Sequence, residues 1–274
     1  MAIQNSLQKK NTQKTSISTF LTNDIVKQQI NNVVGGKDGQ RFISAIISAV
    51  NTNPSLQECT NQSILSGALL GESLKLSPSP QLGNYYLVPF NDKDKGKVAQ
   101  FQLGYKGYIQ LAIRSGQYKK LNVLAIKEGE LIRFDPLNEE IEVNLIEDEE
   151  IRENTPTIGY YAYFEYTNGF RKAMYWSKKK MESHALKYSS GYRAKKGFTF
   201  WEKDFDAMAY KTMLRQLISK WGVMSIEMQT AIDSDMAVIN EDGSKSYVDN
   251  QPEVVDVVEE TPSDAKDALF GANN

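Results

Sequence analysis

The sequence IGYYAYFEYTNGFRKAMYW, residues 158–176, decides the fold class of this chain. It contains two runs rich in aromatic and apolar residues, Ile158–Tyr166 and Phe170–Trp176, separated by Thr167-Asn168-Gly169. Asn-Gly between two such runs is typical of the tight turn of a β-hairpin, because both residues accept a positive φ at low cost. The segment therefore predicts two antiparallel strands.

The sequence around this hairpin predicts further strands and several helices. Strand-like runs occur at 85–90, 98–103, 121–126, 131–134 and 141–146. Apolar residues spaced three and four apart predict helices at 42–50, 62–75, 105–115, 177–188 and 201–220. Because runs of strands are flanked by runs of helices, we expect an α+β fold. Its core would be an antiparallel β-sheet with hairpins, backed by helices and preceded by an N-terminal helical segment.

The two ends of the chain differ in composition from its middle. We expect residues 1–36 to be a flexible N-terminal arm, since its beginning is polar and lacks the apolar region of a secretion signal. Residues 37–232 would form the folded core of the chain. Residues 233–274 are rich in Asp, Glu, Ser and Asn, which predicts a disordered acidic linker ending in a short docking peptide at 264–270.

Composition excludes several classes of protein. The chain has 274 residues, of which 41% are hydrophobic, enough for one sizeable core. Its single cysteine, Cys59, excludes an internal disulfide and suits a reducing cytoplasm. The sequence contains no apolar run of about 18 residues, so we expect no membrane-spanning segment and a cytoplasmic location.

Basic and aromatic residues are interleaved at high density in residues 171–220. This segment holds thirteen Lys and Arg against four Asp and Glu, a net charge of +9, together with nine aromatic residues. Cations neutralise phosphates, and aromatic rings stack on unpaired bases whatever their sequence. The combination indicates single-stranded nucleic acid. A solvated basic face over an aromatic core would give the same composition, and composition alone does not separate the two interpretations.

Acidic residues are concentrated in two other blocks. Residues 128–153 hold eleven acids and two bases, a net charge of −9, and residues 241–274 carry a net charge of −7. Because acids repel phosphate, we expect the first block to lie away from bound DNA, on an outer rim or a contact between subunits. A plain solvated loop is the alternative interpretation of that block.

Three predicted helices carry polar or basic residues on one face. Lys106, Gln110 and Arg114 are spaced four apart, as are Lys203, Ala207, Lys211 and Arg215. Like charges at this spacing repel unless an anion lies across them, and a phosphate backbone would be such an anion. In the third helix, Ser177 is the expected N-cap and Lys178–Lys180 occupy the first turn, where an anion can bind the free N–H groups.

Enzymatic interpretations have less support. Gly35-Gly36-Lys37 lacks the spacing and the hydroxyl of a phosphate-binding loop. Cys59 and the single histidine, His184, fit core packing better than a zinc site or a nucleophile–base pair. Acids in the first turn of the 201–220 helix are explained by the helix dipole without a magnesium ion. We therefore expect no catalytic residue, no metal and no cofactor.

Three blocks of the sequence resemble the phage-encoded RecT family of single-strand annealing proteins, distant relatives of the lambda Red beta protein. The first block joins Asn53-Pro54-Ser55-Leu56 to Gly67–Glu72. The second is Gln102–Ile109 followed by Arg114-Ser115-Gly116. The third is Ala209–Thr212 followed by Arg215, so the resemblance extends from about residue 41 to about residue 221.

The resemblance implies a function and a set of partners. It implies ATP-independent annealing of complementary single strands in phage homologous recombination, in the cytoplasm of the bacterial host, and it makes residues 37–232 the DNA-binding annealing core. It also implies assembly into homo-oligomeric rings or helical filaments, and partnership with a phage 5′→3′ exonuclease and a host single-strand-binding protein. Two alternatives stay open: a sequence-tolerant coating protein for single-stranded DNA without annealing activity, and a nuclease.

The resemblance does not assign the DNA contacts, which we predict from the helix faces and basic segments above. A groove would hold one strand by its phosphates with the bases exposed, while three aromatic residues stack, wedge or simply pack in the core. The predicted DNA-binding residues are Tyr105, Lys106, Gln110, Arg114, Arg171, Lys172, Lys178, Lys187, Arg193, Lys196, Trp201, Tyr210, Lys211 and Arg215.

Overall fold

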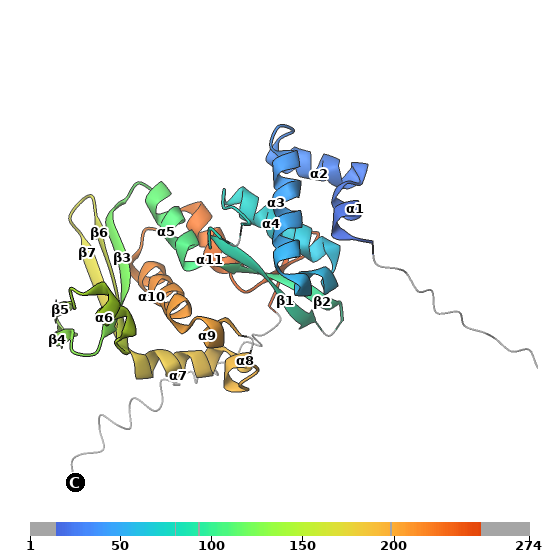
Figure 1. Ribbon diagram of the computed structural model, residues 1–274. Helices are drawn as coiled ribbons and strands as arrows, with labels where there is room; N and C mark the ends of the chain where they lie inside the picture. The colour runs from blue at the N-terminus through green and yellow to red at the C-terminus, as the bar shows by residue number, and fades with distance from the viewer. Residues whose placement is uncertain (1–14, 80, 93, 198, 248–274) are drawn as a thin grey trace, which may run out of the picture.

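The computed structural model describes residues 15–79, 81–92, 94–197 and 199–247, and its architecture is mixed helix and antiparallel sheet, as predicted (Figure 1). The expected beginning of the arm, residues 1–14, and the expected docking peptide at 264–270 lie outside the described residues. None of the described helices is both long and apolar enough to cross a membrane.

The chain begins with a helical segment in which the N-caps fit the sequence. The elements are α1 (Ile17–Leu21), α2 (Asp24–Val34), α3 (Gly39–Thr52), the 3-10 helix η1 (Pro54–Glu58) and α4 (Asn61–Ser73). Ser16, Asn23 and Thr60 accept backbone N–H groups at the start of α1, α2 and α4, which satisfies donors that a helix leaves free. α3 ends at Asn53-Pro54, because the residue before a proline disfavours the helical conformation.

Part of the expected flexible arm is folded. Leu21 of α1 and Ile30 of α2 are completely buried and belong to the same apolar cluster as Ile46 of α3 and Ile64 of α4. The boundary predicted at residue 36 is therefore wrong for α1 and α2. Two short apolar stretches in a polar context carry little periodicity, and these helices gain their stability by packing on α3 and α4.

A two-stranded hairpin, β1 (Tyr85–Asp92) and β2 (Gly96–Leu103), packs against α4. β2 is buried along most of its length because a C-terminal segment covers its other side. Phe101 pairs with Ala237 in an isolated bridge, next to the short hairpin of β8 (Val238–Ile239) and β9 (Lys245–Ser246). The core therefore continues to about residue 247, beyond the boundary predicted at residue 232.

The predicted hairpin at 158–176 forms the middle and one edge of a three-stranded antiparallel sheet. The strands are β3 (Tyr118–Lys127), β6 (Thr157–Tyr166) and β7 (Arg171–Ser177), in the order β3-β6-β7. Gly169 in the turn has φ +87°, which a side chain would strain. Alternate residues of β6, from Tyr160 to Tyr166, are buried on the face that packs against α10 (Phe205–Trp221) and α7 (Lys178–Tyr188).

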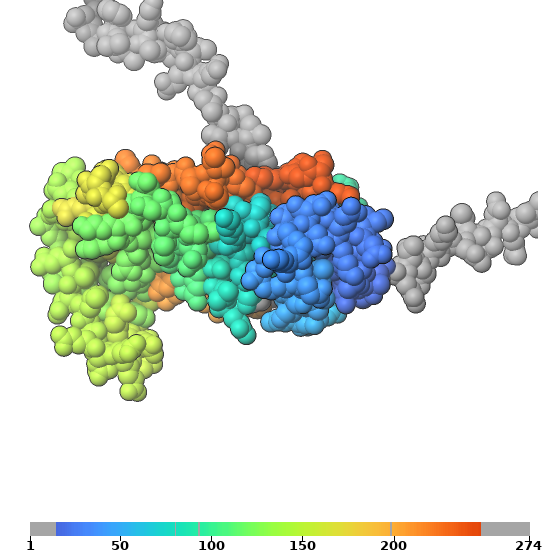
Figure 2. All heavy atoms as spheres, turned by 90° about the horizontal axis from the view of Figure 1, so that it is seen from above, coloured from blue at the N-terminus to red at the C-terminus, as the bar shows by residue number. Residues whose placement is uncertain are grey.

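The acidic block at 128–153 is folded and projects from the molecule. It comprises β4 (Leu131–Asp135), β5 (Glu140–Val143) and α6 (Glu149–Asn154), the yellow-green lobe at the lower left of Figure 2. Asp148 caps α6, and two acids occupy its first turn, where the helix dipole favours them. The block is therefore a folded unit and not a loop, and its contact with a neighbouring subunit stays a prediction.

Helix α10 connects the two apolar clusters of the core. Its Leu214 and Ile218 pack with the N-terminal helices and β1–β2, whereas Ala209 and Met213 pack with the sheet and α7. Figure 1 shows α10 between the β3-β6-β7 sheet and α5. The remaining helices are α5 (Tyr105–Arg114), α8 (Ser190–Arg193), α9 (Phe200–Lys203) and α11 (Ile226–Ser234).

Candidate nucleic-acid interface

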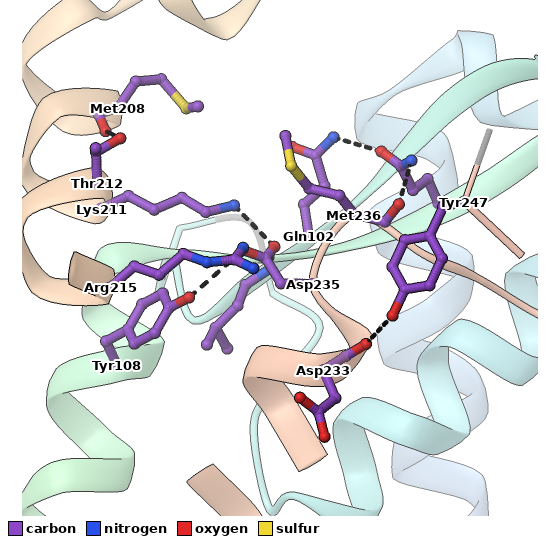
Figure 3. A network of polar contacts seen from close by, with 12 residues as sticks. Gln102, Tyr108, Met208, Lys211, Thr212, Arg215, Asp233, Asp235, Met236 and Tyr247 are labelled. Atoms are coloured by element: carbon purple, nitrogen blue, oxygen red, sulfur yellow. Dashed lines mark hydrogen bonds and ion pairs between the residues drawn. The ribbon is translucent and has the colours of Figure 1, made fainter. Parts of the chain in front are cut away.

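The two basic residues predicted to line the groove from α10 point into the protein. Lys211 is 7% exposed, and its Nζ lies 2.8 Å from Oδ1 of Asp235. Arg215 is four residues further along, and its Nη1 lies 2.7 Å from Oδ2 of the same carboxylate (Figure 3). The expectation that Lys211 is displayed on an open face is therefore wrong, because the anion across this pair is Asp235.

Asp235 is a buried junction of several elements. It follows α11, and it accepts hydrogen bonds from the backbone N–H of Leu103 at 2.9 Å and the hydroxyl of Tyr108 at 3.4 Å. Burial lowers the pKa of the Lys211 ammonium, and the Asp235 carboxylate opposes that shift. Lys211 and Arg215 share the single carboxylate of Asp235, so the network carries one excess positive charge. The Arg215 side chain is 37% exposed.

The three aromatic candidates differ in their exposure. Trp201 is 6% exposed and packs edge-on against Phe205 at 5.0 Å between ring centroids, so it is a core residue. Tyr105 and Tyr210 are half-buried and meet edge-to-face at 5.8 Å. In this structure Trp201 offers no ring face to a base, whereas the Tyr105–Tyr210 pair lies partly at the surface.

The residues predicted from α5 lie on one exposed face of that helix. Lys106, Gln110 and Arg114 are all exposed, while Tyr108 and Leu111 fill the buried side. Arg114 donates from Nη2 to the carbonyl of Leu74 at 2.8 Å and so satisfies the C-terminal end of α4. Lys106 makes no hydrogen bond or ion pair with other described residues, which leaves its ammonium available. We call these three residues the α5 cluster.

A second exposed group, the α7–α8 cluster, comprises Lys178, Lys187, Arg193 and Lys196. Ser177 caps α7 by accepting the N–H of Lys180 at 3.3 Å, as predicted, and no acid lies in the first turn. Residues 189–197, which follow α7, contain the short helix α8. Arg193 donates to the carbonyl of Leu186 at 3.3 Å, which ties α8 to the end of α7.

The third group is the β7 pair, Arg171 and Lys172. Lys172 forms an ion pair with Glu139 of the β4–β5 turn, and its ammonium lies 3.8 Å from the centre of the Trp221 ring. Arg171 is exposed and makes no hydrogen bond or ion pair with other described residues. Both residues line a cleft of about 440 Å³ between the sheet and the β4–β5 hairpin.

The structure distributes the predicted residues over separate surfaces. Figure 1 shows α5 on one side of α10 and α7 with α8 on the other, whereas the β7 pair lies at the end of the sheet near the β6–β7 turn. α10 contacts α5, β6, β7 and α9 and is therefore the element that connects these surfaces. A single continuous groove does not follow from these positions.

Two tyrosines that sequence reasoning missed lie on the outer face of the sheet. Tyr161 and Tyr163 alternate with the buried residues of β6, so they point away from α10. The signal was present in the sequence, because an antiparallel strand with one buried face directs every second residue outward. Within the described residues no group of three or more His, Cys, Asp or Glu side chains is placed to hold a metal ion.

Comparison with known proteins shows the family of this chain. A family model described as "RecT family" matches residues 40–253, and the chain belongs to that family. At the family level it is a phage-type single-strand annealing recombination protein. The chain is 39% identical over 282 residues to the uncharacterized protein YqaK of Bacillus subtilis, covering 98% of this chain and 94% of YqaK. It is 28% identical over 226 residues to protein RecT of Escherichia coli, covering 81% and 80% of the two chains.

Proposed function

We propose that this protein binds single-stranded DNA through its exposed basic clusters and anneals complementary strands without ATP, cofactor or metal. The observation that carries the proposal is membership of the RecT family combined with cations that lack protein partners. Lys106 and Arg171 are exposed and unpaired within the described residues, and Lys178–Lys180 occupy a helix start without any acid in the first turn. Such cations bind DNA phosphates and release the counterions that are condensed on the DNA.

The proposed mechanism is non-catalytic. Phosphates of one strand would dock on the α5 and α7–α8 clusters, with α10 as the rigid connection between them. The first turn of α7 adds free N–H groups and the helix dipole to the lysine charges. Neutralising one backbone lowers the repulsion that a second strand meets, and holding the first strand extended reduces the entropy lost on pairing.

Assembly into a ring or a filament belongs to this proposal. The acidic lobe projects from the molecule (Figure 2), so copies could associate head to tail if it meets a basic cluster of a neighbour. We further propose that the protein acts in the bacterial cytoplasm with a phage 5′→3′ exonuclease and a host single-strand-binding protein. We propose that the polar C-terminal segment contacts the host single-strand-binding protein.

A strand-mixing experiment tests the function. Two complementary oligonucleotides, one with a fluorophore and one with a quencher, are mixed in EDTA without nucleotide, with and without the protein. We expect the protein to accelerate quenching of the complementary pair and to leave a non-complementary pair unquenched. A coating protein without annealing activity would bind both strands but slow the quenching, which would refute the proposal.

A nuclease is tested in the same samples. End-labelled single strands are incubated with the protein and Mg²⁺ and analysed for shortening. We expect full-length strands, because the first-turn acids are already engaged: Asp204 accepts the N–H of Ala207 at 2.9 Å, and Asp206 accepts the Tyr160 hydroxyl at 2.5 Å. Magnesium-dependent shortening that persists in further purified protein would contradict a purely non-catalytic role.

A further inference from the structure

The outer face of the three-stranded sheet carries a pair of parallel aromatic rings. Tyr161 and Tyr163 are two residues apart on β6, their ring planes differ by 11°, and their centroids are 6.5 Å apart. That spacing follows from the rise of a β-strand, about 3.3 Å per residue. It is also roughly twice the distance of about 3.4 Å between successive stacked bases. Both rings are only half-buried.

The two rings line a cleft between the sheet and the β4–β5 hairpin. The β4–β5 hairpin approaches the sheet at two points, through the contact of Phe134 with Tyr175 at 5.2 Å and through the ion pair of Glu139 with Lys172. Between hairpin and sheet lies the cleft of about 440 Å³, and Tyr161 and Tyr163 belong to its lining. Its volume falls in the range of pockets that hold a small aromatic ligand.

The charges around the cleft are not equivalent. Arg133 pairs with Asp135 at 3.3 Å, and Lys172 pairs with Glu139, so both cations already have partners. Arg171 has none among the described residues, and it lies close enough to both phenols to oppose the burial that raises the pKa of Tyr161 and Tyr163. The lining therefore combines two ring faces with one free guanidinium, which matches the base and the phosphate of a nucleotide.

We propose that this cleft binds unpaired nucleotides of single-stranded DNA, with bases stacked on Tyr161 and Tyr163 and a phosphate on Arg171. The inference rests on the proposed function and adds a base-contacting surface to the phosphate contacts of the helices. The opposite wall belongs to the acidic block that charge alone predicts to lie away from DNA, and its Glu140 and Glu142 repel phosphate. The sugar–phosphate backbone therefore runs on the Arg171 side, and the base edges face the hairpin.

The experiment compares a normal oligothymidine strand with an abasic strand of the same length. In the double variant Tyr161→Val and Tyr163→Val, valine keeps the strand propensity but removes both rings. We expect affinity for the normal strand to fall at least roughly five-fold for each ring, with no change for the abasic strand. Arg171→Gln should weaken binding of both strands and lower the salt slope by about 0.7.

Matched variants separate stacking from other effects. Tyr161→Phe with Tyr163→Phe keeps the rings and should bind normally, whereas Glu140→Gln with Glu142→Gln should bind the normal strand more tightly. Photocrosslinking of the wild-type protein to a strand with 5-iododeoxyuridine should place adducts on Tyr161 or Tyr163, and this result does not depend on how any variant folds.

Three outcomes overturn the inference. If the valine variant binds normal and abasic strands like the wild type, the rings do not stack on bases. If crosslinks occur only elsewhere, the cleft is not on the path of the DNA. If the valine variant changes oligomer size without DNA and leaves the affinity unchanged, the cleft binds a second copy of the chain. Failure of the wild-type protein to bind any single strand would instead refute the proposed function itself.

Discussion

Arg152 Nε lies 2.6 Å from Oε1 of Glu130, whose side chain is completely buried. The same carboxylate accepts the backbone N–H of Lys127 at 2.7 Å and that of Ile146 at 3.2 Å. One acid of the acidic block therefore holds β3, the turn before β4 and the segment before α6 together. Its role is structural, in contrast to the exposed acids around it.

This arrangement predicts how stability depends on pH. Burial alone would raise the pKa of Glu130, but the hydrogen bonds from Arg152 and from the amides of Lys127 and Ile146 outweigh it, so the pKa lies below the ordinary value of 4.5. The unfolded state therefore takes up the proton first, and the stabilisation is lost as the pH falls from about 4.5 through the folded-state pKa. Urea unfolding between neutral and acidic pH measures this loss.

A pair of variants isolates the contribution of Glu130. Glu130→Gln should destabilise the fold by about 1–3 kcal/mol at neutral pH and flatten the acid dependence. Glu128→Gln, at an exposed position nearby, is the control and should change neither quantity. An unchanged acid dependence in Glu130→Gln would mean that other carboxylates dominate the acid transition.

Removing the carboxylate of Asp235 should destabilise the core strongly. Asp235→Asn leaves Lys211 and Arg215 without their shared counterion, and loss of one partner of a buried ion pair costs about 3–5 kcal/mol. Chemical denaturation measures the change, with the exposed Asp233→Asn as control. Equal stability of the two variants would show that water or a rearrangement neutralises the cations.

The exposed cations should contribute to DNA affinity independently of sequence. Lys106→Gln should weaken binding of all single strands equally and lower the slope of log affinity against log salt by about 0.7. Lys211→Met should leave that slope unchanged, since its ammonium is already paired with Asp235. Fluorescence anisotropy over a salt series measures both, with Lys37→Gln in the α2–α3 turn as a surface control. A reduced slope for Lys211→Met would show that Asp235 releases the lysine to DNA.

Charge reversal on the acidic lobe should alter assembly. We expect Glu147→Lys, Glu149→Lys and Glu150→Lys together to change oligomer size and its response to salt in the absence of DNA, if the lobe meets a basic surface of a neighbour. Asp148 is retained because its side chain accepts the N–H of Ile151 at 3.0 Å and caps α6. Analytical ultracentrifugation measures the size, and an unchanged distribution would exclude the lobe from the contact.

Truncations at two positions should behave differently. Removing 248–274 should preserve folding and annealing by the purified protein and impair recombination in cells. Removing 241–274 should also destabilise the fold, because it deletes β9 and the hydrogen bond from the Tyr247 hydroxyl to the carbonyl of Asp233. Thermal unfolding and the strand-mixing assay distinguish the two, and loss of annealing in the shorter deletion would place 248–274 within the annealing machinery.

Local patterns predicted the elements of the fold better than the orientation of the site residues. Asn168-Gly169 and the Ser177 cap act within a few residues of the chain, and the structure confirms both. The direction of Lys211 depends on Asp235, which is 24 residues away in a segment whose composition indicates a disordered linker. No helical periodicity contains that information.

Trp201 illustrates the same difficulty for aromatic residues. A tryptophan among cations looks like a stacking platform, but burial against Tyr192 and Phe205 depends on how α8, α9 and α10 pack. Tyr161, by contrast, could have been placed on the outer face from the alternation of β6 alone. The alternation predicts which residues of β6 face outward. It does not predict that the β4–β5 hairpin lies over this face and forms a cleft with it.

The ion network around Asp235 has a consequence for the order of events in the cell. Two like charges four residues apart on α10 would normally favour an external anion as a folding partner. Because the chain supplies its own carboxylate, helix and core can form without any nucleic acid. The protein therefore reaches its folded state before it binds DNA, and its stability does not depend on the prior presence of a strand.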